Sequence, residues 1–201
     1  LPCIKGNCYE FQDYIAGKDG VLEKFLKLGV SGVRLDVVDE LSDEFVRKIE
    51  KKVHEFDKNN VVMGEVWEDA STKISYSTRK EYFTKNELNS VMNYPIKETV
   101  LEYIFSGNSF NLESTIRMIE NNYPKVVRDN LMNFLTTHDT KRVFSEILRA
   151  NNNNEEIAIK LYKIASALIF TLPGVPSIFY GDEYGMLDND GSSRGCFDWN
   201  N

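Results

Sequence analysis

The sequence contains few of the residues that build metal and disulfide sites. Its 201 residues include three cysteines, Cys3, Cys8 and Cys196, and two histidines. An odd cysteine count with no even framework favours free thiols and a reducing compartment, so we expect a cytoplasmic protein, with export of the parent protein as the alternative. No third ligand lies near Cys3 and Cys8, and we expect no metal site there.

Basic charge and long hydrophobic runs are also lacking. The net charge is −7 and the pI is near 5.0, which argues against nucleic acid as a partner because such binding needs a basic face. The longest apolar run, 164–172, is about half the length of a membrane span. The 42% hydrophobic content is ordinary for a globular protein with one sizeable core.

Short apolar segments alternate with helical patterns along the whole chain. This alternation predicts an α/β fold with a parallel sheet. The starts of the segments are 29 to 44 residues apart, enough for a crossover helix between parallel strands. Residues 1–16 and 69–86 are predicted to be loops. The expected strands begin near residues 32, 61, 90, 132 and 176.

The segment Gly32-Val33-Arg34-Leu35-Asp36-Val37-Val38 is predicted to be a short buried strand. Arg34 and Asp36 are two residues apart, so their side chains leave the same face. A buried carboxylate is costly unless a cation accompanies it, and Arg34 supplies that cation. A dry, ionised Asp36 is suited to nucleophilic attack, although a structural ion pair fits the segment equally well.

Acidic residues recur where the predicted strands end. Asp36, Glu65 and Asp139 follow three of them, and Asp182 with Glu183 follows the last. In a parallel α/β barrel, the carboxyl ends of the strands form the active-site face. The acids therefore predict an active site at that face.

Two mechanisms fit three carboxylates on one barrel face. Glycoside cleavage uses one carboxylate as nucleophile and a protonated carboxyl as acid. Enolase-like chemistry uses such carboxylates to hold Mg²⁺, but Arg34 would compete with the metal for Asp36. Trp67 and Tyr180 add flat faces that suit sugar rings. The pair His138-Asp139 also occurs in metal-dependent phosphohydrolases, which need further histidines, so we set that interpretation aside.

Three motifs carry a family resemblance. Gly32-Val33-Arg34-Leu35-Asp36, Gly64-Glu65-Val66-Trp67 and Thr137-His138-Asp139-Thr140 resemble, in order and spacing, conserved regions of the α-amylase family of retaining glycoside hydrolases. Residues 91–95 and 170–183 are also similar to that family. The Asp-Val-Val-Asp-Glu run that begins at Asp36, and the Asn-Tyr-Pro at 93–95, most resemble the neopullulanase and cyclomaltodextrinase branch.

The resemblance implies a role for each matching residue. Asp36 would be the nucleophile, Glu65 the acid and then the base, and Asp139 the group that holds sugar hydroxyls and stabilises the transition state. The implied substrates are α-glucans: starch, maltooligosaccharides, cyclodextrins or pullulan. No cofactor and no metal are implied, and neither nucleic acid nor a membrane is expected as a partner. The implied substrate-binding residues are Arg34, His138, Trp67, Tyr180 and Arg194.

The resemblance also implies a partial fold. The family's catalytic domain is a TIM (β/α)8 barrel, and its first conserved region is not found here. Residues 1–201 are therefore expected to be a truncated catalytic domain with strands 4 to 8, lacking strands 1–3 and the inserted domain. We expect little hydrolysis by this chain alone, self-association through exposed sheet edges, and no structural calcium. A non-catalytic sugar-binding or scaffold homologue is the alternative, but such proteins usually lose the acids.

Overall fold

The computed structural model describes residues 7–85 and 87–199 in two compact units. Of the described residues, the first unit comprises 7–85, 87–92 and 122–130, and the second comprises 93–121 and 131–199. Cys3 lies outside the described residues, whereas Cys8 and Cys196 are free thiols. None of the helices in the described ranges is long and apolar enough to cross a membrane.

A three-stranded parallel sheet organises the first unit. Its strands are β1 (Gly32–Leu35), β2 (Val61–Gly64) and β5 (Ser90–Val91), in the order β1-β2-β5. The register pairs Leu35 with Gly64. The residues that follow these two, Asp36 and Glu65, therefore leave the sheet at the same edge, which confirms the predicted parallel pairing.

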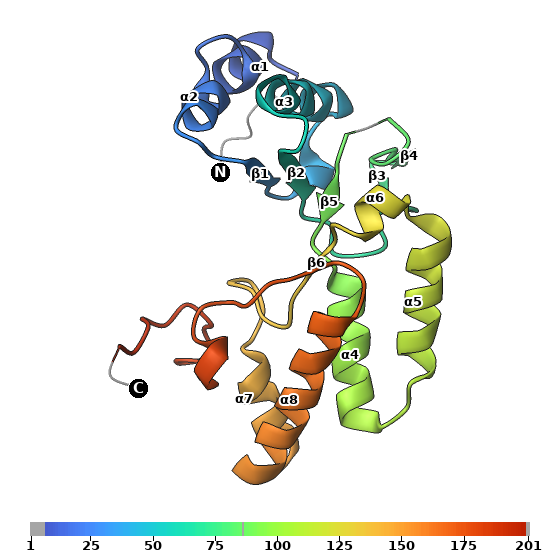
Figure 1. Cartoon of the computed structure of the whole chain (residues 1–201), viewed down its shortest axis with the longest axis vertical. Helices are drawn as coiled ribbons and strands as arrows, with labels where there is room; N and C mark the ends of the chain where they lie inside the picture. The colour runs from blue at the N-terminus through green and yellow to red at the C-terminus, as the bar shows by residue number, and fades with distance from the viewer. Residues whose placement is uncertain (1–6, 86, 200–201) are drawn as a thin grey trace. The chain divides into compact units, whose positions relative to one another are not determined.

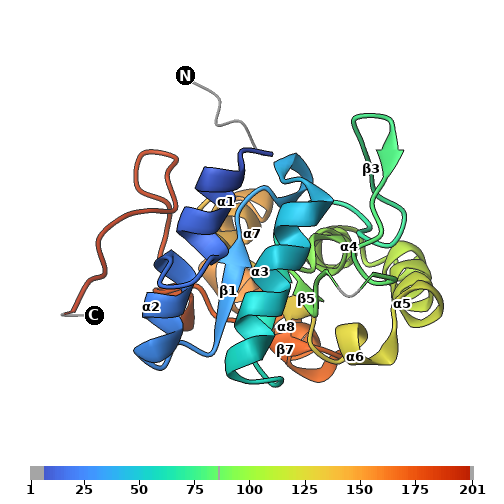
Figure 2. The same ribbon diagram turned by 90° about the horizontal axis from the view of Figure 1, so that it is seen from above.

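Three helices lie together on one side of this sheet: α1 (Tyr9–Ala16), α2 (Val21–Lys27) and α3 (Asp43–Phe56) (Figure 1, Figure 2). Helix α3 begins where Ser42 Oγ accepts a hydrogen bond from Phe45 N at 3.3 Å. Its buried stripe recurs at helical spacing and packs against α1, α2 and β2. The stripe consists of Phe45, Val46, Ile49 and Val53.

The prediction of a loop over residues 1–16 is wrong for 9–16, which form α1. The ring of Phe11 meets that of Phe45 edge-on, with centroids 5.7 Å apart. Packing on α3 stabilises a helix whose own sequence pattern is weak. The short helix α6 (Lys125–Arg128) also belongs to this unit and packs on β5.

The predicted surface loop 69–86 contains a β-hairpin. Strands β3 (Ile74–Ser75) and β4 (Thr78–Arg79) pair antiparallel, and a short 3-10 helix, η1 (Val38–Glu40), lies nearby in the same unit. Lys80 and Tyr82, which follow the hairpin, are buried. Polar composition alone predicted exposure, but these side chains bury their stems and place their polar ends on partners in 39–43.

The second unit is mainly helical. Helices α4 (Tyr94–Ser106), α7 (Val143–Ala150) and α8 (Glu155–Thr171) pack together in the order α4-α8-α7, and α5 (Phe110–Asn122) follows α4 (Figure 1). Helix α4 has Pro95 in its first turn and stops at Gly107, which adopts φ +70, where glycine carries no Cβ penalty.

A two-stranded parallel sheet, β6 (Met132–Asn133) with β7 (Val175–Pro176), completes this unit together with the 3-10 helix η2 (Asp182–Tyr184). The last strand was expected to begin near residue 176, and β7 is limited to 175–176. Ser177 N still donates to Asn133 O at 2.7 Å, and the chain then turns away at Gly181, with φ +86, into η2.

Substitution of Phe134 tests whether this residue belongs to the core of the second unit. Its side chain is fully buried and meets the ring of Tyr94 edge-on, with centroids 4.9 Å apart. Phe134→Ala is expected to lower the free energy of unfolding by about 3–5 kcal/mol, measured by urea denaturation. The control Phe110→Ala removes an exposed ring from the same unit and is expected to cost less than about 1 kcal/mol. Equal losses would contradict this assignment of the core.

Candidate active site

Arg34 contacts two carboxylates that follow neighbouring strands. Its Nη1 lies 2.5 Å from Asp36 Oδ1, and its Nη2 lies 3.0 Å from Glu65 Oε1. Its Nε donates to Met92 Sδ at 3.4 Å. The planar guanidinium therefore fixes both acids at one edge of the sheet. Arg34, Asp36, Glu65 and Trp67 are called the Arg34 cluster below.

Glu65 is held by more than its ion pair. The residue is 4% exposed, Trp67 Nε1 donates to Oε1 at 3.1 Å, and Val37 N donates to Oε2 at 2.9 Å. Val37 has φ +43, a left-handed conformation that is costly for a β-branched residue. That turn directs the Val37 amide at Glu65 and ends β1 immediately after Asp36.

Asp36 is not dry, contrary to the prediction. Its side chain is 71% exposed, and β1 is only partly buried. The reason lies in the topology, because β1 is at the end of the order β1-β2-β5 and no strand in the described chain pairs with its other side. The predicted contact with Arg34 is confirmed, whereas the predicted burial is wrong.

The second unit contains a cluster around Asp139. Asp139 Oδ1 lies 2.8 Å from Arg194 Nη2, and Oδ2 lies 2.9 Å from His138 Nε2. Arg194 Nε also donates to His138 O at 2.9 Å. The loop that follows β6 is fixed locally, since Thr137 N donates to Thr140 Oγ1 at 2.9 Å. His138, Asp139 and Arg194 are called the Asp139 cluster below.

Arg142 is a residue whose importance the sequence did not reveal. It is fully buried, and its guanidinium donates to Tyr180 O at 2.6 Å and to Ser193 O at 2.9 Å. The rings of Phe179 and Tyr180 each lie 4.9 Å from its Cζ. Arg142 thus joins the segment before η2 to the segment that carries Arg194. The only indication of this burial in the sequence was the position of Arg142 directly before the apolar residues 143–144.

Tyr180 was predicted to offer its ring to a sugar. In the structure this ring packs on Arg142, and its hydroxyl donates to Gly195 O at 2.8 Å. The predicted residues thus fall into the Arg34 cluster in the first unit and the Asp139 cluster in the second. Tyr180 is connected to the second cluster through Gly195, the residue after Arg194. Their predicted catalytic and binding roles stay predictions.

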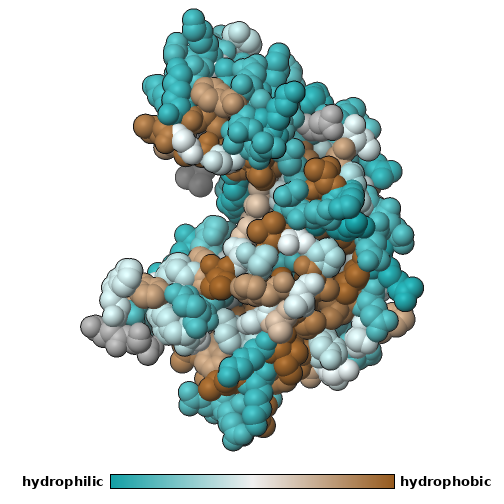
Figure 3. All heavy atoms as spheres, viewed as in Figure 1, coloured by the Kyte–Doolittle hydropathy of each residue, from teal (hydrophilic) through white to brown (hydrophobic). Residues whose placement is uncertain are grey.

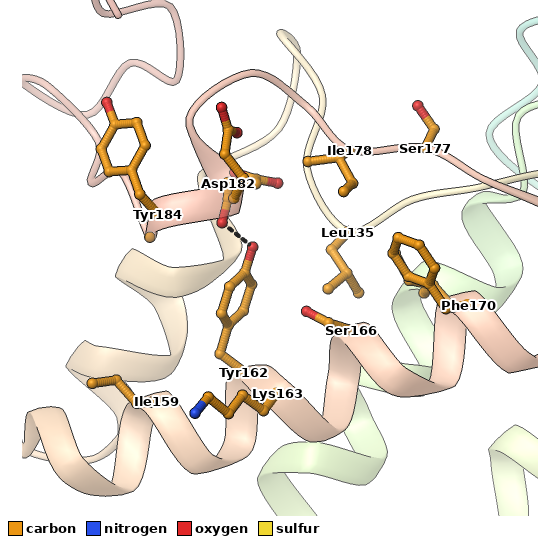
Figure 4. A pocket seen from close by; sticks show the side chains of 13 residues that line it. Leu135, Ile159, Tyr162, Lys163, Ser166, Phe170, Ser177, Ile178, Asp182 and Tyr184 are labelled. Carbon is orange, nitrogen blue, oxygen red and sulfur yellow. Dashed lines mark hydrogen bonds between the residues drawn. The ribbon is translucent and has the colours of Figure 1, made fainter. Parts of the chain in front are cut away.

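A pocket of about 460 Å³ opens in the second unit without touching the Asp139 cluster. Figure 4 shows α8 along one side, with Tyr162 donating from its hydroxyl to Asp182 O at 2.7 Å. Leu135 and Ile178 face α8 across the pocket. Asp182 is buried beside Arg142 Nη1 at 3.1 Å. Burial raises the pKa of Asp182 to about 6, although a hydrogen bond with Thr136 and the charge of Arg142 act in the opposite direction.

The fold and the Arg34 cluster together define an α/β scaffold with paired carboxylates at the carboxyl ends of parallel strands, the arrangement of barrel enzymes. A family model described as alpha amylase, catalytic domain, matches residues 12–199. The chain therefore belongs to the alpha-amylase family, whose catalytic domain is a TIM barrel.

Known relatives agree with this assignment. A cyclomaltodextrinase from Thermoanaerobacter pseudethanolicus is 31% identical over 205 residues, which cover 99% of this chain and 32% of the relative. Neopullulanase 2 from Thermoactinomyces vulgaris is 29% identical, over 92% of this chain and 29% of its own length. The chain spans about a third of the length of these relatives.

Solved structures share the fold. A cyclic alpha-maltosyl-(1→6)-maltose hydrolase from Arthrobacter globiformis superposes with a TM-score of 0.78 at 23% identity, covering 98% of this chain and 41% of that structure. A likeness this close at low identity establishes a common backbone arrangement.

The raised pKa of Asp182 predicts a pH-dependent stability. Its ordinary pKa is 3.8, so between about pH 4 and pH 6 the folded state binds this proton more tightly than the unfolded chain does. The associated stabilisation is present below pH 4 and is lost as pH rises through 6, by about 3 kcal/mol. Asp182→Asn removes this titration.

Urea unfolding of the two proteins from pH 3.5 to pH 7 checks the sign. The unfolding free energy of the original chain is expected to fall relative to that of Asp182→Asn as pH rises. A difference between the two proteins that does not change with pH would refute the shift. Asp188→Asn, at another carboxyl that contacts an arginine in this unit, is the matched control.

Proposed function

We propose that this chain carries the catalytic acids of a retaining glycoside hydrolase that acts on α-glucans. The observation that supports the proposal is the Arg34 contact with both Asp36 and Glu65, at the ends of adjacent parallel strands. Retaining enzymes need two carboxyl groups close together, about 5–5.5 Å apart, on either side of the bond they cleave. A shared guanidinium is a device that keeps two carboxylates at short range.

The proposed reaction has two displacements. A carboxylate oxygen of Asp36 attacks the anomeric carbon while the glycosidic bond breaks, and the leaving oxygen takes the proton from Glu65. Glu65 then removes a proton from water, which attacks the same carbon and releases Asp36. Arg34 orients both carboxylates, and its guanidinium would compete for Asp36 with the Mg²⁺ that the enolase-like alternative requires.

The Asp139 cluster suits the recognition of sugar hydroxyls. Asp139 accepts from Arg194 and contacts His138, so its carboxylate has a fixed orientation. We propose that Asp139 binds hydroxyls of the sugar undergoing cleavage, with His138 and Arg194 beside it. Trp67, half-exposed next to Glu65, supplies a flat apolar face.

The names of the relatives set the proposed substrate class. Cyclomaltodextrinase, neopullulanase and maltogenic alpha-amylase name enzymes of α-linked glucose polymers or rings. We propose the same class for this chain. We also propose that β1, β2, β5, β6 and β7 correspond to strands 4 to 8 of the family barrel, so that further barrel strands are needed for turnover.

Glu65→Gln tests the proposed acid. The 201-residue chain alone is expected to hydrolyse no maltooligosaccharide, so the variant is made in a chimera in which this chain replaces the matching third of the Thermoanaerobacter cyclomaltodextrinase. Hydrolysis of maltotriose is expected to fall about 10²–10⁴-fold. Cleavage of an aryl maltoside is expected to fall less, because its leaving group needs no proton. Reducing-sugar and chromogenic assays measure the two rates.

Two controls accompany this measurement. Glu68→Gln changes an exposed glutamate three residues away and is expected to leave both rates unchanged. Asp36→Asn is expected to abolish both rates, since the nucleophile serves either leaving group. A folded chimera that retains its rate with Glu65→Gln would disprove the assignment, and a folded chimera that only binds sugar would support the scaffold alternative.

Self-association of the isolated chain is a separate prediction. Strand β1 has an edge without a strand partner among residues 7–85 and 87–199, and Leu28 and Val30 near it are exposed. Figure 3 also displays hydrophobic surface in the region of α4 and α8, where Ile164 and Phe170 are exposed. Sedimentation velocity is expected to detect dimers or larger species as concentration rises. A compact monomer at high concentration would contradict this prediction.

A further inference from the structure

The β3–β4 hairpin and the segment after β1 border an open, shallow cleft of about 490 Å³ in the first unit. Both walls follow strands that carry acids of the Arg34 cluster, since 39–43 comes after Asp36 and the hairpin comes after Glu65. Figure 2 shows the hairpin projecting beyond α3. We call this the hairpin cleft. Its lining residues include Glu40, Asp43, Ser75, Tyr76, Thr78 and Lys80.

The two walls of the hairpin cleft are joined by several polar contacts. Lys73 Nζ lies 2.9 Å from Asp39 Oδ2, and Ser75 Oγ donates to Asp39 O at 3.2 Å. Lys80 Nζ lies 2.9 Å from Asp43 Oδ1 and donates to Leu41 O at 3.1 Å. Because Lys80 and Lys73 are largely buried, these ion pairs are shielded from water, and they hold the hairpin in place.

Tyr76 stands at the tip of the hairpin. It is 77% exposed, and its hydroxyl donates to the Glu40 carboxylate on the opposite wall. The ring is thus anchored at its polar end while its surface remains in contact with solvent. This hydrogen bond restricts the Tyr76 ring before a ligand binds. Stacking of a flat ligand face on the ring therefore costs less conformational entropy.

The chemistry of this cleft matches a carbohydrate. Sugars present an apolar C–H face and a rim of hydroxyls, and the cleft offers an aromatic ring beside carboxylate, hydroxyl and ammonium groups. Three carboxylates line the cleft, from Asp39, Glu40 and Asp43, against one ammonium, from Lys80. Lys73 pairs with Asp39 and Lys80 pairs with Asp43, so the negative charge of Glu40 remains. This charge disfavours a phosphate, whereas a neutral polyhydroxylated ligand can donate its hydroxyl hydrogens to the carboxylates.

We propose that the hairpin cleft is a subsite for α-glucan chains outside the cleavage position, and that Tyr76 is its stacking platform. The proposal rests on the proposed function for its ligand class. Because the cleft follows the same two strands as Asp36 and Glu65, a chain bound there continues along the face where cleavage is proposed. The hairpin therefore makes the protein prefer longer glucans to short ones.

Titration calorimetry of the 201-residue chain with maltoheptaose tests the proposal, because the whole cleft lies in one unit of this chain. Tyr76→Ala is expected to weaken binding about tenfold. Tyr76→Phe keeps the ring but loses the hydroxyl contact with Glu40, and it is expected to weaken binding less. Tyr14→Ala removes another largely exposed tyrosine, from α1, and is expected to leave binding unchanged. Circular dichroism verifies that each variant folds.

Each outcome separates this inference from the proposed function. Unchanged binding by Tyr76→Ala, or no binding of maltoheptaose by the original chain, would overturn the subsite. Equal binding of cellohexaose would overturn its assignment to α-glucans. None of these calorimetric outcomes changes the activity comparison between the chimera and its Glu65→Gln variant. Conversely, if Glu65→Gln does not lower the activity of the chimera, the calorimetric result for Tyr76 still stands.

Discussion

The Arg34 side chain is the constraint on which the proposed chemistry depends. Parallel pairing of β1 with β2 brings Asp36 and Glu65 to the same edge, but pairing alone would leave two acids repelling each other. One guanidinium that contacts both removes that repulsion and fixes their orientation. Replacing arginine by lysine would keep the charge and lose the planar fork that reaches two carboxylates at once.

In the second unit, too, one arginine side chain contacts several groups, but there it stabilises a loop segment instead of orienting two acids. Arg142 is fully buried and joins Tyr180, Asp182 and Ser193, so a single planar cation organises a segment with little regular structure. Ser193 Oγ in turn donates to Thr137 O at 3.1 Å, next to the Asp139 cluster. The segment that carries Arg194 is therefore held beside the Asp139 cluster by the hydrogen bonds of Arg142 and Ser193 rather than by a helix or strand.

The sequence predicted the parallel pairing, the positions of β1, β2, β5 and β6, and the Arg34–Asp36 contact, because all of these follow from local periodicity and spacing. It did not predict helix α1, the hairpin or the role of Arg142. Those features depend on contacts between distant residues, such as Phe11 with Phe45 and Lys73 with Asp39. Strand β7 begins near the expected residue but is only two residues long, although 177–180 contains strand-forming residues, and Gly181 turns the chain into η2.

The two acids of the Arg34 cluster differ in how firmly they are held. Glu65 is buried and accepts from Val37 and Trp67 in addition to its ion pair, so its position is over-determined. Asp36 is exposed and has one ion pair, whose strength in water is small. The proposed nucleophile thus depends on whatever covers the free side of β1. When protein or substrate excludes water there, the Arg34–Asp36 attraction strengthens and Asp36 is held more firmly.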